Sequence, residues 1–316
     1  MSPEVRAGSP ARYVFVLGVG RCGSTVVHEV LARHPAVGFV SNLEDRFPRL
    51  RLGGRLNNPL YRRIPPRLTR KGRLRCAPSE AYRLLDQQVS PVLSMPFRDL
   101  TALDVTPWLA TRLEEFFDSR ARAQGRPVFL HKFTGWPRVG LLREVFPDAR
   151  FVHVIRDGRA VANSWLQMPW YLGYRGPEHW QFGLLPAAYQ AEWEAAGRSH
   201  ALLAGLGWKL LMDAFEAARR DVAPGHWLDV RYEDLVTHPR SGLAEIVTFM
   251  GLDWDDSFEV GFAAHRFTTA RGQAFRRDLD ARSLELLDES LDGHLRRYGY
   301  EPGGQPRHTH RTDSWS

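Results

Sequence analysis

The chain has 316 residues, of which 43% are hydrophobic and 25% charged, and its formal net charge is +7. This composition is globular and excludes collagen-like and largely disordered chains. No stretch approaches the roughly 20 apolar residues that a membrane-spanning helix needs, and the first twelve residues carry prolines and charges in place of an apolar signal core. We therefore expect a soluble, cytoplasmic protein.

The positive charge is concentrated in one segment. Residues 46–75 contain eleven Arg or Lys residues and no acid, and the rest of the chain is mildly acidic. Such a segment can attract an anionic membrane surface, nucleic acid or an acidic substrate, or it can be a solvated insertion. We keep a membrane surface as a candidate partner and expect no nucleic acid, while the oligomeric state stays open.

The expected elements alternate between strands and helices. The strands are expected at 13–17, 37–40, 128–131, 151–155 and 227–230, and the helices at 24–33, from 107 onward, at 139–146, 242–250 and 281–297. This order predicts an α/β fold with a mostly parallel sheet. We expect one domain over residues 1–300, an irregular Arg/Pro-rich insertion at 46–80, an aromatic lid at 165–193 and a disordered tail at 301–316.

A glycine-rich loop, GVGRCGST at residues 18–25, follows the first expected strand and opens the first helix. Its glycines let backbone N–H groups approach a phosphate at the positive end of that helix. Ser24 stands where the lysine of a nucleotide-hydrolysing P-loop should be, and Arg21 is the loop's only cation. The loop therefore predicts anion binding without identifying an NTPase.

The loop also contains Cys22, one of two cysteines in the chain; the other is Cys76. Two cysteines support neither a disulfide framework nor a zinc site, and we expect no metal. Cys22 is either a small residue that the loop tolerates or a thiol made more acidic by the helix N-terminus.

A second phosphate-binding segment is expected at residues 151–164. Arg156 lies at a strand end, and Ser164 follows about two helical turns later, so a guanidinium and a hydroxyl can meet one phosphate. Asp157 is a poor Walker-B acid because Arg156 adjoins it. Each residue alone is also an ordinary structural residue.

Together the two segments resemble the sulfotransferases that use 3′-phosphoadenosine 5′-phosphosulfate (PAPS), which pair a P-loop-like loop with an Arg-x₇-Ser motif. The resemblance implies a three-layer P-loop-like fold, PAPS as the donor and no metal. It extends to a Y-E-D-L segment beginning at Tyr232 and to a late Arg271-Gly272, where the family's middle lysine is missing. The residues that it assigns to the donor are Arg21, Cys22, Gly23, Ser24, Thr25, Arg156, Ser164, Tyr232, Arg271 and Gly272.

Two local stretches are similar to the tyrosylprotein sulfotransferases. Residues 44–48, EDRFP, match their Glu-x-Arg segment, and Lys132 followed by Phe-Pro and Arg-Asp-Gly-Arg matches another. The resemblance makes Glu44 the general base, while Lys132 and Arg21 stabilise the leaving nucleotide. His28, which we expect on the polar face of the first helix, and His131 are alternative bases.

Other interpretations stay open at this stage. A P-loop kinase or NTPase needs a phosphate lysine and a Mg²⁺-binding acid that the sequence does not show, and a non-catalytic anion-binding protein needs only the basic segment. For an enzyme, we expect a small-molecule, lipid or glycan acceptor beneath the aromatic stretch, with a hydroxyl or amine as the accepting group. Both alternatives, a hydroxyl and an amine, stay open from the sequence.

Overall fold

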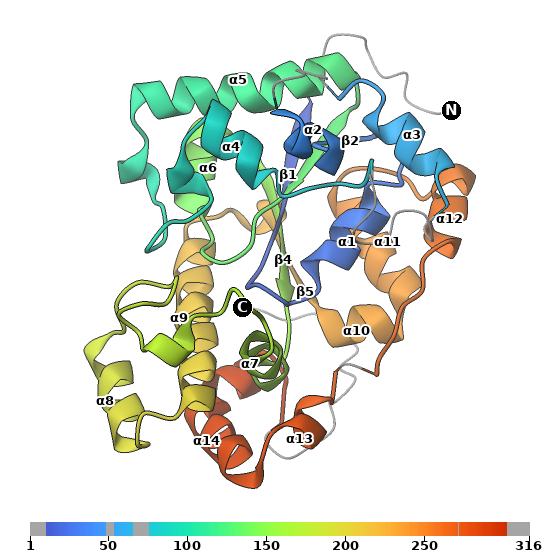
Figure 1. Ribbon diagram of the computed structural model, residues 1–316. Helices are drawn as coiled ribbons and strands as arrows, with labels where there is room; N and C mark the ends of the chain where they lie inside the picture. Colours follow the sequence, from blue (N-terminus) through green and yellow to red (C-terminus); the bar gives the residue numbers. More distant parts are fainter. Residues whose placement is uncertain (1–10, 49–53, 66–75, 271, 302–316) are drawn as a thin grey trace.

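The computed structural model describes residues 11–48, 54–65, 76–270 and 272–301 (Figure 1). Its centre is a five-stranded sheet with the order β2-β3-β1-β4-β5, in which every pair of neighbours is parallel. The strands are β1 (Arg12–Leu17), β2 (Val37–Phe39), β3 (Val128–Lys132), β4 (Arg150–Ile155) and β5 (Trp227–Arg231). The predicted α/β class with a parallel sheet flanked by helices is confirmed.

Helices connect the strands and cover both faces of the sheet (Figure 1). Within the described residues, none is both long and apolar enough to cross a membrane. They are α1 (Ser24–Leu31), α2 (Asn42–Arg46), α3 (Asn57–Arg63), α4 (Tyr82–Gln88), η3 (Pro91–Leu93), η4 (Ala102–Asp104), α5 (Pro107–Gln124), α6 (Val139–Val145), α7 (Gly158–Leu166), η5 (Gly173–Arg175), α8 (Ala187–Ala195), α9 (His200–Arg220), η6 (Pro224–His226), α10 (Tyr232–Thr237), α11 (Pro239–Phe249), α12 (Asp256–Ala263), α13 (Phe275–Asp278) and α14 (Ala281–Arg297).

The core forms where helices pack on the sheet. Phe117 of α5 meets the sheet edge-on, with its ring centroid 5.7 Å from that of Phe15 and 6.0 Å from that of Phe129. Helix α1 packs against β1, β3 and α11. Helix α5 begins where the sequence predicts, because the Thr106 hydroxyl accepts a hydrogen bond from the Leu109 N–H and Pro107 supplies the first turn.

The strand order places a topological switch point between β1 and β4 at the carboxyl edge of the sheet. Strands β1 and β4 are neighbours, but the chain leaves β1 toward β2 on one side and leaves β4 toward β5 on the other. In open α/β sheets, ligands bind where the connections diverge in this way. The glycine-rich loop after β1 and Arg156 after β4 both lie at this point.

Part of the insertion that we expected to be irregular is helical. Helix α3 is anchored by tertiary contacts: Asn58 donates hydrogen bonds to the carbonyls of Ala32 and His34, and the Tyr61 ring is buried against Phe39. Local composition does not reveal these contacts. Residues 49–53 and 66–75, which hold much of the basic charge, lie outside the described residues, as do the expected tail from 302 and the N-terminal ten residues.

The aromatic stretch at 165–193 divides into two parts. Helix α8, which contains Trp193, packs on the outer side of α9 (Figure 1). The loop before it places the Trp170 ring beside Gly20 and leaves Trp170 45% and Tyr174 62% exposed. Most of the other rings are buried in the core: those of Trp165, Tyr171, Trp180, Phe182 and Trp193.

Candidate functional site

The glycine-rich loop forms a cradle at the start of α1. Gly23 has φ 100°, in the left-handed region, and directly precedes α1, whose first turn receives no side-chain cap from it. A β-carbon at Gly23 would lie 2.2 Å from the Tyr232 ring, and one at Gly18 would lie 2.6 Å from the Val154 carbonyl oxygen. Only glycine fits at either position, so the backbone N–H groups can face an anion.

Hydrogen bonds join the loop to the second predicted phosphate segment. The Arg21 Nε donates to the Ser164 Oγ at 2.9 Å, and Arg156 Nη1 donates to the Arg21 carbonyl at 2.9 Å. The Trp165 indole N–H donates to the Gly20 carbonyl at 2.7 Å. Residues more than 130 positions apart in the chain therefore form one cluster of two guanidinium groups and a hydroxyl.

Tyr232 forms a wall of this cluster, at the start of α10. The Arg156 guanidinium lies over its ring, with Cζ 4.9 Å from the ring centroid. The structure thus places four of the predicted donor-binding residues in one cluster of contacts: Arg21, Arg156, Ser164 and Tyr232. Arg271 lies outside the described residues.

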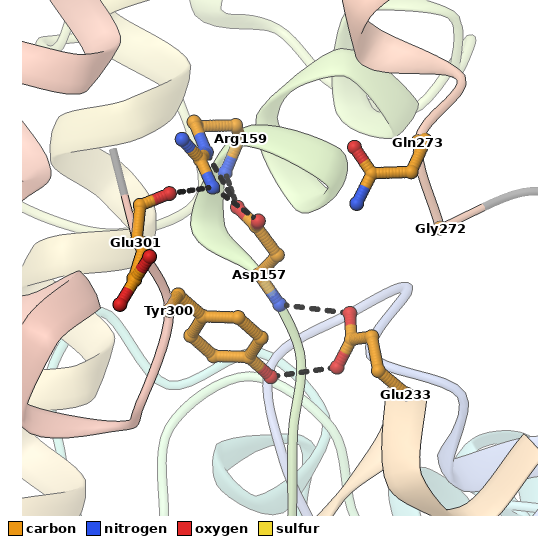
Figure 2. A pocket seen from close by; sticks show the side chains of 7 residues that line it. All are labelled: Asp157, Arg159, Glu233, Gly272, Gln273, Tyr300 and Glu301. Atoms are coloured by element: carbon orange, nitrogen blue, oxygen red, sulfur yellow. Dashed lines mark hydrogen bonds and ion pairs between the residues drawn. The ribbon is translucent and has the colours of Figure 1, made fainter. Parts of the chain in front are cut away.

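A buried network of side chains surrounds Asp157, the residue that follows Arg156 (Figure 2). Glu233 accepts hydrogen bonds from the Asp157 N–H at 3.2 Å and from the Tyr300 hydroxyl at 2.7 Å. Arg159 pairs with Asp157 at 2.7 Å. Gly272 lines the same cavity, whose volume of about 10 Å³ suits at most one water.

The cavity beside this network is too small for a nucleotide. We therefore interpret the network as one that stabilises the turn at Asp157. Burial raises the pKa of Glu233 above its ordinary value, and the neighbouring Asp157 charge adds to this effect. Burial and the Glu233 charge raise the pKa of Tyr300. The C-terminal part of the described chain is thereby fastened to the turn that carries Arg156.

Cys22 lies buried within the loop. Burial raises the pKa of its thiol, which outweighs the lowering effect of nearby hydrogen bonds and cations. The structure therefore corrects the idea of an acidified Cys22. It is a small, buried loop residue.

Lys132 connects the loop to a carboxylate on the opposite side from Arg156. Its ammonium donates to the Thr25 Oγ1 at 2.8 Å and forms an ion pair with the Glu80 Oε1 at 2.6 Å. Arg21, the other cation assigned to the leaving group, instead reaches Ser164. The structure thus separates the two predicted catalytic cations: Lys132 lies at Thr25, and Arg21 lies on the α7 side.

Glu44, the predicted base, is 3% exposed. Its carboxylate forms a capping box with Ser41, accepts a hydrogen bond from the Asn57 side-chain amide and lies 3.4 Å from Arg120 Nε. Every one of these contacts is local to α2, α3 and α5. The structure does not show Glu44 in contact with Lys132.

The two alternative histidines are buried as well. His28 is 2% exposed and lies inside the fold, which corrects its expected place on the polar face of α1. Burial and the Lys132 charge lower the pKa of His131 to about 3 and also lower that of His28. Both rings are therefore screened from solvent, in surroundings that favour the neutral form of an imidazole.

Sequence reasoning missed Glu80 and the Glu233–Tyr300 pair. Glu80 belongs to no motif, and only the pairing of residues 77–79 with residues 40–42 brings it to the sheet edge. Glu233 is the second residue of the Y-E-D-L segment, so the sequence did mark its position, although not its buried partner Tyr300. In the part of the chain that the structure describes, no group of three His, Cys, Asp or Glu side chains is placed to hold a metal.

Comparisons with known proteins agree with this geometry. Residues 13–256 match the model of the sulfotransferase family. The chain is 24% identical over 190 residues to omega-hydroxy-beta-dihydromenaquinone-9 sulfotransferase Stf3 of Mycobacterium bovis, covering 58% of this chain and 42% of that protein. It is 29% identical over 116 residues to protein-tyrosine sulfotransferase A of Caenorhabditis elegans, covering 36% of this chain and 25% of that protein.

The chain thus spans less than half the length of these curated relatives. Among solved structures, sulfotransferase STF9 from Mycobacterium avium superposes with a TM-score of 0.56 at 18% identity, covering 96% of this chain and 81% of that one. This likeness shows that the fold is shared.

Proposed function

Because the chain belongs to the sulfotransferase family, we propose that it transfers the sulfuryl group of PAPS to a hydroxyl or amine acceptor. The observation that carries this proposal is the Arg21–Ser164 hydrogen bond, which joins the P-loop to the segment assigned to the 3′-phosphate. A donor that carries a phosphosulfate on the 5′ oxygen and a phosphate on the 3′ oxygen of its ribose needs two anion sites side by side. No γ-phosphate or metal is needed for the transfer.

The residues fit a donor of this kind. The N–H groups at the start of α1, with Ser24 and Thr25, would hold the 5′-phosphosulfate. Arg156 and Ser164 would hold the 3′-phosphate through charge-assisted hydrogen bonds, and the Tyr232 ring would face the adenine. Cys22 and Gly23 contribute backbone to the loop.

Sulfuryl transfer resembles phosphoryl transfer in passing through a loose, in-line transition state, so charge develops on the departing bridging oxygen. Lys132, only 6% exposed at its side chain, is the cation beside Thr25 that can stabilise this charge. Electrostatic stabilisation by a preorganised group is strongest where water is excluded. We assign the leaving-group role to Lys132 and a donor-binding role to Arg21.

The reaction also needs a general base that removes the proton of the acceptor. The family resemblance assigns this role to Glu44. A general base must come within hydrogen-bond reach of the proton that it removes, whereas the Glu44 carboxylate is enclosed by Ser41, Asn57 and Arg120. Its role stays a prediction, which a Glu44→Gln variant would test.

The named relatives act on acceptors as different as protein tyrosine and a hydroxylated menaquinone. For this chain we propose a hydroxylated small molecule, lipid or glycan. Trp170, which lies beside Gly20 and is 45% exposed, is placed to contact such an acceptor.

Ligand-induced thermal stabilisation tests the donor class. A ligand that binds only the folded state raises the melting temperature. We expect 3′-phosphoadenosine 5′-phosphate (PAP) to stabilise the protein without magnesium. Stabilisation by Mg-ATP alone would instead indicate an NTPase, and stabilisation by oligonucleotides with steep salt dependence would indicate a nucleic-acid-binding protein.

A further inference from the structure

Residues 77–79 pair with residues 40–42, which directly follow β2, and this pairing brings Glu80 to the carboxyl edge of the sheet. Pro78 forms an antiparallel bridge with Ser41, and the Ser79 N–H donates to the Val40 carbonyl at 2.9 Å. The next residue, Ala81, has φ 54°, a left-handed conformation that is uncommon for a residue with a side chain. The backbone around Glu80 is thus held in a specific and costly conformation at the carboxyl end of the sheet.

The Glu80 side chain contacts Lys132, the cation that we assign to the leaving group. Its Oε1 lies 2.6 Å from the Lys132 ammonium, which also bonds the Thr25 Oγ1 at 2.8 Å. The Glu80 side chain is 27% exposed, whereas Glu44 is 3% exposed. Glu80 therefore has both a contact with the cation that we assign to the leaving group and partial access to solvent.

Two other polar side chains nearby are already engaged in hydrogen bonds. Asp45 accepts hydrogen bonds from the Leu84 N–H of α4 and from the Ser79 hydroxyl. Thr134, two residues past Lys132, shares a hydrogen bond with the hydroxyl of the partly buried Tyr82 at 3.2 Å.

We infer that Glu80, and not Glu44, is the general base; this inference rests on the proposed sulfuryl transfer. In the step, the acceptor hydroxyl gives its proton to the Glu80 carboxylate as its oxygen forms a bond to sulfur. The bond between sulfur and the bridging phosphate oxygen breaks, and its electron pair stays on the departing PAP. Lys132 faces that oxygen, so its partner Glu80 lies close to the transferred group.

The glutamine variant separates basicity from positioning. In Glu80→Gln, the amide oxygen still accepts a hydrogen bond from Lys132, but the side chain no longer takes a proton. Loss of a general base typically costs about 10²–10⁴-fold in rate. We expect a loss of this size in Glu80→Gln. The matched control is Glu192→Gln, whose glutamate is 30% exposed and pairs with Lys209 at 3.1 Å between α8 and α9.

The assay uses ³⁵S-labelled PAPS with a total cell extract as the source of acceptors, and initial rates are compared at equal extract concentration. PAP affinity, measured by calorimetry, checks that each variant is folded and binds the nucleotide. If the native protein neither binds PAP nor labels the extract, the proposed function itself fails. If the native protein labels the extract, a Glu80→Gln rate within threefold of native overturns the Glu80 assignment alone.

Two further readouts distinguish a base from a residue that merely positions Lys132. The acidic limb of the native pH–rate profile should disappear in Glu80→Gln, and formate should restore part of the rate in Glu80→Ala. If the acidic limb persists in Glu80→Gln and formate has no effect on Glu80→Ala, Glu80 is a positioning residue and the inference is wrong.

Discussion

The two flanks of the P-loop are built differently. The nucleotide flank, comprising Arg21, Arg156, Ser164 and Tyr232, is tied together by hydrogen bonds and a cation–π contact and is supported from behind by Glu233. The transfer flank, comprising Thr25, Lys132 and Glu80, consists of one lysine that bridges a hydroxyl and a partly exposed carboxylate. The groups that we assign to the donor are thus held in place by their neighbours, and the group that we assign to proton transfer is partly exposed.

This difference has an energetic meaning. Binding groups that are already ordered lose little entropy when the ligand arrives, so preorganisation favours affinity. A base that must meet varied acceptors needs access, and partial exposure provides it at the cost of a weaker ion pair. Substitutions on the two flanks should therefore change different measured quantities.

The largest effect is expected on the transfer flank. Lys132→Ala removes the cation that we assign to the departing oxygen, and loss of one such group typically lowers turnover by about 10²–10³-fold. Initial rates of label transfer from PAPS measure the loss. Lys209→Ala is the control, because Lys209 forms a similar ion pair away from the site. Equal rates in Lys132→Ala and Lys209→Ala would show that Lys132 does not stabilise the leaving group.

On the nucleotide flank, Arg156→Ala should weaken PAP binding by about 10–100-fold, since a hydrogen bond to a charged group contributes about 1.5–3 kcal/mol. Ser164→Ala should weaken it less, because a neutral donor is lost. Calorimetry with PAP gives both constants. An unchanged dissociation constant in both variants would refute the 3′-phosphate assignment.

The hydrogen bonds of Glu233 with Asp157 and Tyr300 should contribute to the free energy of unfolding. Tyr300→Phe deprives the buried Glu233 carboxylate of a donor, which costs about 1–3 kcal/mol in the free energy of unfolding. Urea unfolding measures this loss. The exposed Tyr174, at 62% exposure, provides a control in Tyr174→Phe, which should change stability little.

The smallest effect concerns pH. Burial raises the pKa of Glu233 in the folded chain, so between the unfolded and folded pKa values the folded protein binds more protons than the unfolded one. The free energy of unfolding therefore falls as pH rises through this range. Glu233→Gln should flatten this part of the profile. A variant profile parallel to the native one, measured by urea unfolding at several pH values, would contradict this.

The sequence predicted the parts that depend on local pattern. The strand ends that carry Lys132, Arg156 and Tyr232 were placed within a residue or two, because buried strands and glycine turns have clear local signals. Glu80 was missed because its position depends on the pairing of residues 77–79 with residues 40–42, which follow β2. His28 was misplaced because eight residues of helix give a weak indication of which face is buried.

The contact between Gly23 and the Tyr232 ring limits how this protein can diversify. A single added carbon at Gly23 would collide with the ring, and the φ of 100° there is strained for any residue with a side chain. Shortening Tyr232 would therefore remove the collision but would still leave glycine as the residue that the loop requires at position 23.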